Sequence, residues 1–182
     1  MTWLRKHRII ELEEGVILAD TPVKLMQKVH QLFSGTVKFE DGSSVVLDES
    51  KAIFIKNRFK GDKIGIFYKF KEELNALKQV FGDDITADLE EFHSHPTKSI
   101  ALQIVSGREG ISLKQAKFLV YYNIDFSATS YWQSRDRMTT KERSENEVFW
   151  IFAANGIEDK IYRAVTAKKN YTLQHFRSDF YD

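Results

Sequence analysis

The sequence predicts an α/β fold in which helices flank a parallel sheet, preceded by a smaller segment of helices and hairpins. From Lys63 onward, short apolar, β-branched runs alternate with helical stretches, which is typical of parallel strands joined by right-handed crossovers. Before Lys63, helical periodicity alternates instead with tight-turn signals. We therefore expect an N-terminal helical and hairpin appendage over residues 1–62 and a main domain over residues 63–182.

The composition is that of an ordinary globular chain. Its 182 residues are 42% hydrophobic and 29% charged, which suffices for a substantial core. The formal net charge is only +1, so any nucleic-acid-binding surface must be local. The absence of cysteine excludes disulfides and thiolate metal sites. With no signal-peptide pattern and no apolar run of about 18 residues, we expect a cytoplasmic protein that does not bind membranes.

The appendage is expected to hold two helices and two hairpins. Thr21 is a suitable N-cap and Pro22 a suitable first helical residue, and the helix that follows should end at Gly35. Strand-like runs around tight-turn residues indicate hairpins over 8–20 and 36–47. A second helix is expected over 48–60, with an inward face of four residues: Ala52, Ile53, Phe54 and Ile55.

The main domain is expected to contain five strands, at 64–68, 84–87, 100–105, 118–122 and 147–153. Helical periodicity and capping signals predict helices at 71–81, 127–138 and 157–175, with short turns around 88–93 and 112–116.

The most informative stretch runs from Ile100 to Met138. Its first strand leads into Ser106–Gly110, where two glycines allow a tight turn or a close backbone approach to a ligand. Its second strand leads to a helix with Ser127 as a plausible N-cap. Because the carboxyl ends of parallel strands meet at one edge of a sheet, the loop and the helix should lie at the edge where ligands bind in α/β proteins.

This stretch resembles the last two motifs of superfamily-two helicases and translocases, most closely those of the Swi/Snf type. SGREGISL at 106–113 looks like the glycine-rich fifth motif, and QSRDR at 133–137 looks like the sixth. Residues 63–81 are similar to the strand and helix of the fourth motif. Residues 8–42 and 149–169 resemble the segments that open and close the second half of small phage and mobile-element helicases. The resemblance implies a RecA-like (P-loop NTPase-like) domain that forms the C-terminal half of an ATP-dependent DNA helicase or translocase.

The resemblance also implies a role for individual residues. Arg137 would be the arginine finger that reaches the γ-phosphate of ATP, and Gln133 would couple that site to the domain interface. Three residues of the glycine-rich loop would join them in facing the nucleotide: Gly107, Glu109 and Gly110. Three others would contact DNA phosphates without reading sequence: Lys69, Ser106 and Arg108.

The sequence contains no G-x-x-x-x-G-K-[ST] loop that could cradle a triphosphate. We therefore expect ATP and Mg²⁺ to be held mainly by an N-terminal RecA-like ATPase domain, supplied in cis or in trans. This chain alone should not hydrolyse ATP. Its expected partners are that domain and DNA, in a bacterial or phage-infected cell.

One departure from the family pattern concerns the second arginine of the sixth motif, which falls at Thr140. Three alternatives stay open: Arg137 acts alone, Arg135 or Arg143 substitutes, or the activity is weak. The departure also favours an alternative function, a catalytically silent DNA- or protein-binding module of the same fold.

Each of these features also has a purely structural interpretation. The arginines near residue 137 could form a solvated helix face, the glycines an ordinary turn, and Lys69 the exposed end of a core strand. A further alternative is a small hydrolase with a metal bound by His93 and His95, although no third ligand is evident at a suitable spacing.

Overall fold

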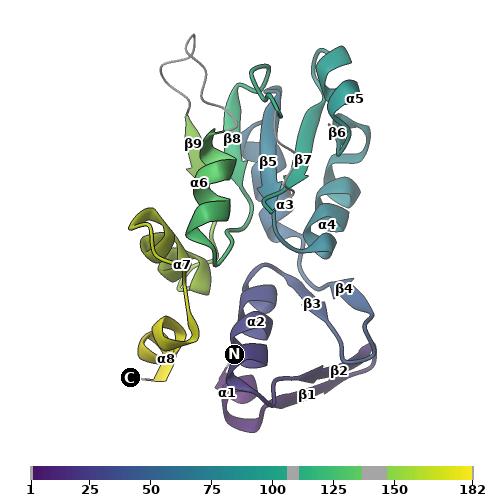
Figure 1. Cartoon of the computed structure of the whole chain (residues 1–182). Coiled ribbons are helices and arrows are strands. Elements are labelled where there is room, and N and C mark those ends of the chain that lie inside the picture. Colours follow the sequence, from purple (N-terminus) through teal and green to yellow (C-terminus); the bar gives the residue numbers. More distant parts are fainter. Residues whose placement is uncertain (1, 106–110, 137–146, 182) are drawn as a thin grey trace.

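The computed structural model describes residues 2–105, 111–136 and 147–181. Its centre is a five-stranded parallel sheet in the order β6-β7-β5-β8-β9 (Figure 1). The strands are β5 (Ile64–Tyr68), β6 (Ile85–Thr86), β7 (Ser99–Gln103), β8 (Phe118–Tyr121) and β9 (Val148–Trp150). The α/β prediction is confirmed, although the strands at 84–87 and 147–153 are shorter than expected.

Both faces of the sheet are buried, and the two faces follow from the alternation of side chains along each strand. On one face, Ile64 and Ile66 of β5 pack against helices α3 (Ser50–Arg58) and α4 (Lys71–Phe81). On the other face, Phe67 of the same strand joins a larger cluster that extends into the appendage. The helices of the main domain that contribute to this cluster are α5 (Leu89–Ser94), α6 (Ala128–Asp136), α7 (Ile157–Thr166) and α8 (Leu173–Tyr181).

Apart from α3, the appendage consists of two antiparallel hairpins and two helices beneath the sheet (Figure 1). Its elements are α1 (Thr2–His7), β1 (Ile9–Leu12), β2 (Gly15–Leu18), α2 (Pro22–Phe33), β3 (Thr36–Lys38) and β4 (Ser44–Val46). The start and stop signals of α2 act as expected. The Thr21 hydroxyl accepts a hydrogen bond from the Lys24 amide (3.2 Å), and Gly35 follows the helix with a left-handed φ of 80°.

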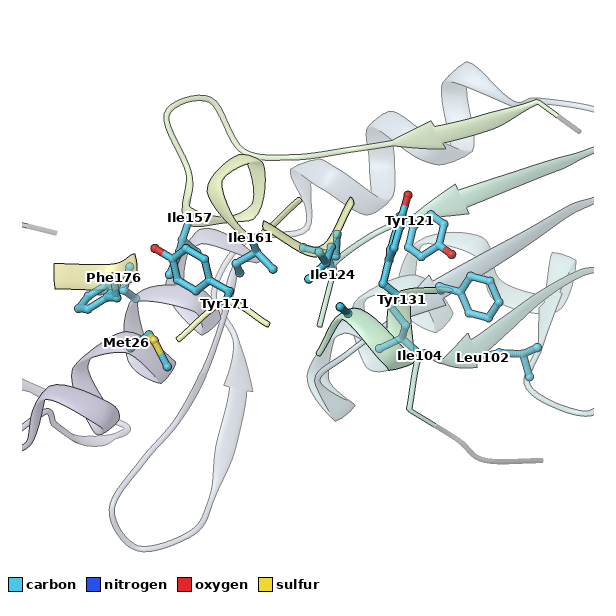
Figure 2. Close-up of a cluster of buried hydrophobic side chains, with 14 of the residues drawn as sticks. Met26, Leu102, Ile104, Tyr121, Ile124, Tyr131, Ile157, Ile161, Tyr171 and Phe176 are labelled. Carbon is cyan, nitrogen blue, oxygen red and sulfur yellow. The ribbon is translucent and has the colours of Figure 1, made fainter. Parts of the chain in front are cut away.

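A single hydrophobic cluster joins the appendage to the main domain. Met26 of α2 lies near Phe176 of α8, and the cluster continues through Ile157 and Ile161 of α7 to Tyr121 of β8 (Figure 2). The boundary at residue 62 stays a prediction. Helix α3 precedes it in sequence, yet packs on the face of the sheet.

The structure corrects three expectations. The helix predicted over 157–175 is instead two helices, because α7 ends at Thr166 and Lys168 adopts a left-handed φ of 60°. Ile53 and Phe54 do not face inward but are 46% and 52% exposed. The short helix α1 was not expected at all. No helix in the described part of the chain is long and apolar enough to cross a membrane.

Candidate functional site

The candidate site lies at the carboxyl edge, the edge of the sheet at which the five strands end. In the strand order, the connection after β5 leads toward the end of the sheet that holds β6, and the connection after β8 leads toward the opposite end, which holds β9. The ends of β5 and β8, which pair directly, therefore flank a topological switch point, where α/β proteins bind ligands. Lys69 follows β5 at this point and Asp125 follows β8. β7, the other neighbour of β5, leads toward residues 106–110.

Lys69 forms an ion pair with Asp125 across this switch point. The two side chains are 17% and 10% exposed, and the Lys69 ammonium lies 4.8 Å from the centre of the Phe126 ring. The pair thus ties the end of β5 to the end of β8. A DNA phosphate at Lys69 would have to compete with the Asp125 carboxylate, and the DNA-binding role of Lys69 stays a prediction.

Beside this pair, a chain of buried hydrogen bonds connects the appendage to the carboxyl edge. His30 of α2 lies 2.6 Å from Asn123 (Nε2 to Oδ1), and the Asn123 amide donates to the Glu73 carboxylate. Glu73 in turn accepts the backbone amides of Lys69 (2.7 Å) and Phe70 (3.0 Å) at the start of α4. The side chains of His30, Asn123 and Glu73 are all fully buried.

Burial shifts the pKa of both titratable groups in this series of hydrogen bonds, His30 and Glu73. It lowers the pKa of His30 well below its usual value, and the nearby Lys69 ammonium adds to that shift. Burial raises the pKa of Glu73. The charge of Lys51 and the hydrogen bond from Asn123 both act against this rise. His30 is therefore neutral at pH 7. Because Asn123 Oδ1 can only accept, His30 donates from Nε2.

A second set of buried polar contacts connects α3, β8 and α7. The Lys51 ammonium donates to the carbonyl oxygen of Tyr122 at the end of β8 (3.0 Å) and to the Glu158 carboxylate (2.9 Å). The side chains of Lys51 and Glu158 are 9% and 0% exposed. The carboxyl edge is thus held by charged and polar groups that come from the appendage and from both sides of the sheet.

Helix α6 presents the stretch that resembles the sixth motif. Ser127 caps it as predicted, accepting the Ser130 amide at 3.2 Å. The Ser134 hydroxyl lies 2.5 Å from the Tyr121 hydroxyl in the core, and this contact fixes the rotation of the helix. Gln133 consequently lies on the exposed side. Arg135 is held over the Trp150 ring, 5.4 Å from its centre.

Most of the other predicted site residues lie outside the described part of the chain: Ser106, Gly107, Arg108, Glu109, Gly110 and Arg137, as do Thr140 and Arg143. Of the predicted set, the structure places Lys69 at the carboxyl edge and Gln133 on α6.

The structure gives His93 and His95 bonds to the backbone. His93 Nε2 lies 2.9 Å from the Ser112 carbonyl, and His95 Nδ1 accepts the amide of Lys98 at 3.2 Å. Among the described residues, no group of three histidine, aspartate or glutamate side chains could hold a metal ion. The carboxylates nearest the switch point are engaged as well, Asp125 by Lys69 and Glu73 by Asn123 and two amides.

The sequence analysis missed the polar residues that hold the carboxyl edge: Lys51, Glu73, Asn123, Asp125, Glu158 and His30. Two signals for them exist in the sequence. His30 interrupts the apolar face of α2, and Asn123 and Asp125 directly follow a buried strand, where polar side chains often serve a site.

Comparison with known proteins supports the fold. No protein-family model and no curated protein matches the chain. Among solved structures it is similar to "Mss116p DEAD-box helicase domain 2 bound to an RNA duplex", with a TM-score of 0.50 and 14% identity over 69% of this chain and 57% of that one. The fold is RecA-like, as predicted. A second similar structure is the C-terminal part of the Fun30 ATPase domain, with a TM-score of 0.49 and 19% identity over 69% and 44% of the two chains. The chain thus spans about half the length of each of these solved chains.

Proposed function

We propose that this chain is the C-terminal RecA-like domain of an ATP-dependent DNA helicase or translocase of the Swi/Snf type. It works with an N-terminal RecA-like ATPase domain in cis or in trans. One observation carries the proposal. The stretches that resemble the fourth, fifth and sixth motifs occur on consecutive parts of one RecA-like domain: on β5 and α4, after β7, and on α6.

The chain's own contribution to ATP hydrolysis is charge at the transition state. ATP would supply the phosphoryl group, and bound Mg²⁺ would neutralise part of its charge. Both would be held mainly by the first domain. Arg137, directly after α6, stabilises the negative charge that develops on the transferring phosphoryl group. Gln133 projects from α6 toward the first domain, and Gly107, Glu109 and Gly110 face the nucleotide.

DNA binding in this proposal uses phosphate contacts. Ser106, Arg108 and Lys69 grip one strand at the carboxyl edge, and closure of the two domains shifts that grip along the strand. For Lys69, binding of a phosphate means giving up its ion pair with Asp125. The Lys69 contact is therefore weaker than that of an unpaired lysine.

The alternative function, a silent DNA- or protein-binding module, has one specific observation in its favour, which is Thr140 in place of the second arginine. Such a module would keep the same fold and bind its partner, but it would add nothing to ATP hydrolysis.

The experiment that tests the proposal measures ATP hydrolysis by this chain, by a first domain that carries the phosphate-cradling loop, and by the two together, each with and without DNA. We expect hydrolysis only when both domains are present, and stimulation by DNA. RNA of the same sequence serves as the control for the class of nucleic acid. If this chain adds no activity to the first domain, the silent module is the better account.

A further inference from the structure

The short helix α1 lies at the end of the appendage away from the sheet (Figure 1). Trp3 is 62% exposed, the largest fraction among the large hydrophobic residues that the structure describes. Its indole stacks on the His7 imidazole, with ring centres 3.8 Å apart and planes 24° apart. Because His7 covers one face of the indole, this exposure comes largely from the opposite face and the ring edge.

The helix that carries this ring is basic. Helix α1 contains Arg5, Lys6 and His7, Arg8 follows it, and no acidic residue lies within it. Among the described residues, Arg5, Lys6 and Arg8 form no ion pair with a carboxylate.

The two arginines are held by aromatic rings instead. Their guanidinium carbons lie over the ring of Tyr181 on α8, at 5.4 Å from its centre for Arg5 and 5.8 Å for Arg8. Contact with a ring orients a guanidinium without neutralising its charge. One terminal nitrogen of Arg8 is moreover buried without a hydrogen-bond partner among the described residues. Within the described residues, the positive charges of α1 are therefore not neutralised by a carboxylate.

The other two tryptophans are less exposed. Trp132 is 37% exposed and donates its indole N–H to the Val165 carbonyl at 3.0 Å, and Trp150 stacks against Tyr121. Trp3 is thus the most exposed of the three tryptophans.

We propose that α1 is an auxiliary binding site for single-stranded nucleic acid, separate from the carboxyl edge. An unpaired base stacks on the open face of Trp3, and a flanking phosphate contacts Lys6, which is exposed and lies three residues further along the same side of the helix. Aromatic stacking with nearby cations is the physical basis of sequence-tolerant single-strand binding. The strand is single because a base within a duplex has no free face to stack on the indole. The site extends the proposed function and does not depend on it.

The test measures binding of a fluorescent oligo(dT) to this chain without ATP. Trp3→Ala should weaken binding about 5- to 150-fold, the effect expected for the loss of one base–aromatic stack. Trp3→Phe should restore part of the affinity. Lys6→Ala should reduce the slope of log affinity against log salt by about 0.7, the value for one phosphate contact with a single strand. Trp132→Phe, and Lys78→Ala on the exposed side of α4, are the matched controls and should leave binding unchanged.

Four outcomes distinguish this site from its rivals. Oligo(dT) or oligo(rU) binding that depends on Trp3 supports the site and identifies its preferred sugar. Equal affinity of the wild type and of Trp3→Ala, with unchanged circular dichroism, overturns it. So does Trp3-dependent binding to anionic lipid vesicles without binding to oligonucleotides. Competition by double-stranded DNA that is as strong as competition by the single strand also overturns the proposed site. Since no ATP is present, none of these results depends on whether the chain takes part in ATP hydrolysis.

Discussion

Replacing Arg137 by alanine should lower the rate of DNA-stimulated ATP hydrolysis about 10³- to 10⁵-fold in the two-domain enzyme. The physical reason is that an arginine finger stabilises charge present in the transition state and much less so in bound ATP. The loss should therefore appear in kcat, while the affinity for ATP, measured with a fluorescent analogue, changes little.

The matched control for this prediction is Arg177→Ala, which removes an exposed arginine from α8 and should leave kcat unchanged. The same assay separates the alternatives left by Thr140. If Arg135→Ala or Arg143→Ala reduces kcat as strongly and Arg137→Ala does not, the finger is misassigned. If all three variants keep full activity, the chain supplies no arginine to the reaction.

Replacing Lys51 by methionine should lower the free energy of unfolding by about 3–5 kcal/mol. The substitution leaves the Glu158 carboxylate, which is 0% exposed, without its cation in the interior. It also removes the hydrogen bond to the Tyr122 carbonyl at the end of β8. Urea unfolding, followed by circular dichroism, measures the change.

A double substitution shows whether the uncompensated charge causes this loss. Lys51→Met with Glu158→Leu should recover most of the lost stability, because residue 158 then no longer places an unpaired carboxylate in the interior. The control is the exposed pair of Arg163 and Asp159 on the same helix α7, where Arg163→Ala should cost less than about 1 kcal/mol. A loss of under about 1 kcal/mol for Lys51→Met would contradict the account, since Glu158 would then have another source of stabilisation.

The local elements of the fold could be predicted from the sequence because their signals are local. The bounds of β5 and α4 agree with the expectation, since an apolar run and a helical period are each complete within a few residues. The break between α7 and α8 could not be predicted. No proline or glycine marks it, and it coincides with a long-range contact, in which the Asn170 side chain accepts the Ala128 amide at 2.9 Å.

The candidate site, like the fold, could be predicted only in part. That β7 and α6, which flank or carry the two motif-like stretches, belong to one α/β domain could be predicted from the alternation of strands and helices. The bonds that hold the carboxyl edge could not, because His30 and Asn123 are 93 residues apart and neither belongs to a recognisable pattern. The exposure of Gln133 likewise depends on a contact between α6 and β8 that only the folded chain reveals.

The most direct measurement of the central claim asks whether α6 faces the nucleotide across an interface with a first domain. Because the chain contains no cysteine, Asp136→Cys places a single thiol on the exposed side of α6, next to Arg137. The rate of its modification by a thiol reagent is measured alone, with a cysteine-free first domain, and with that domain plus DNA and a non-hydrolysable ATP analogue. The account predicts strong protection only in the last mixture, with Arg177→Cys unaffected. An unchanged rate at residue 136 in that mixture would contradict it.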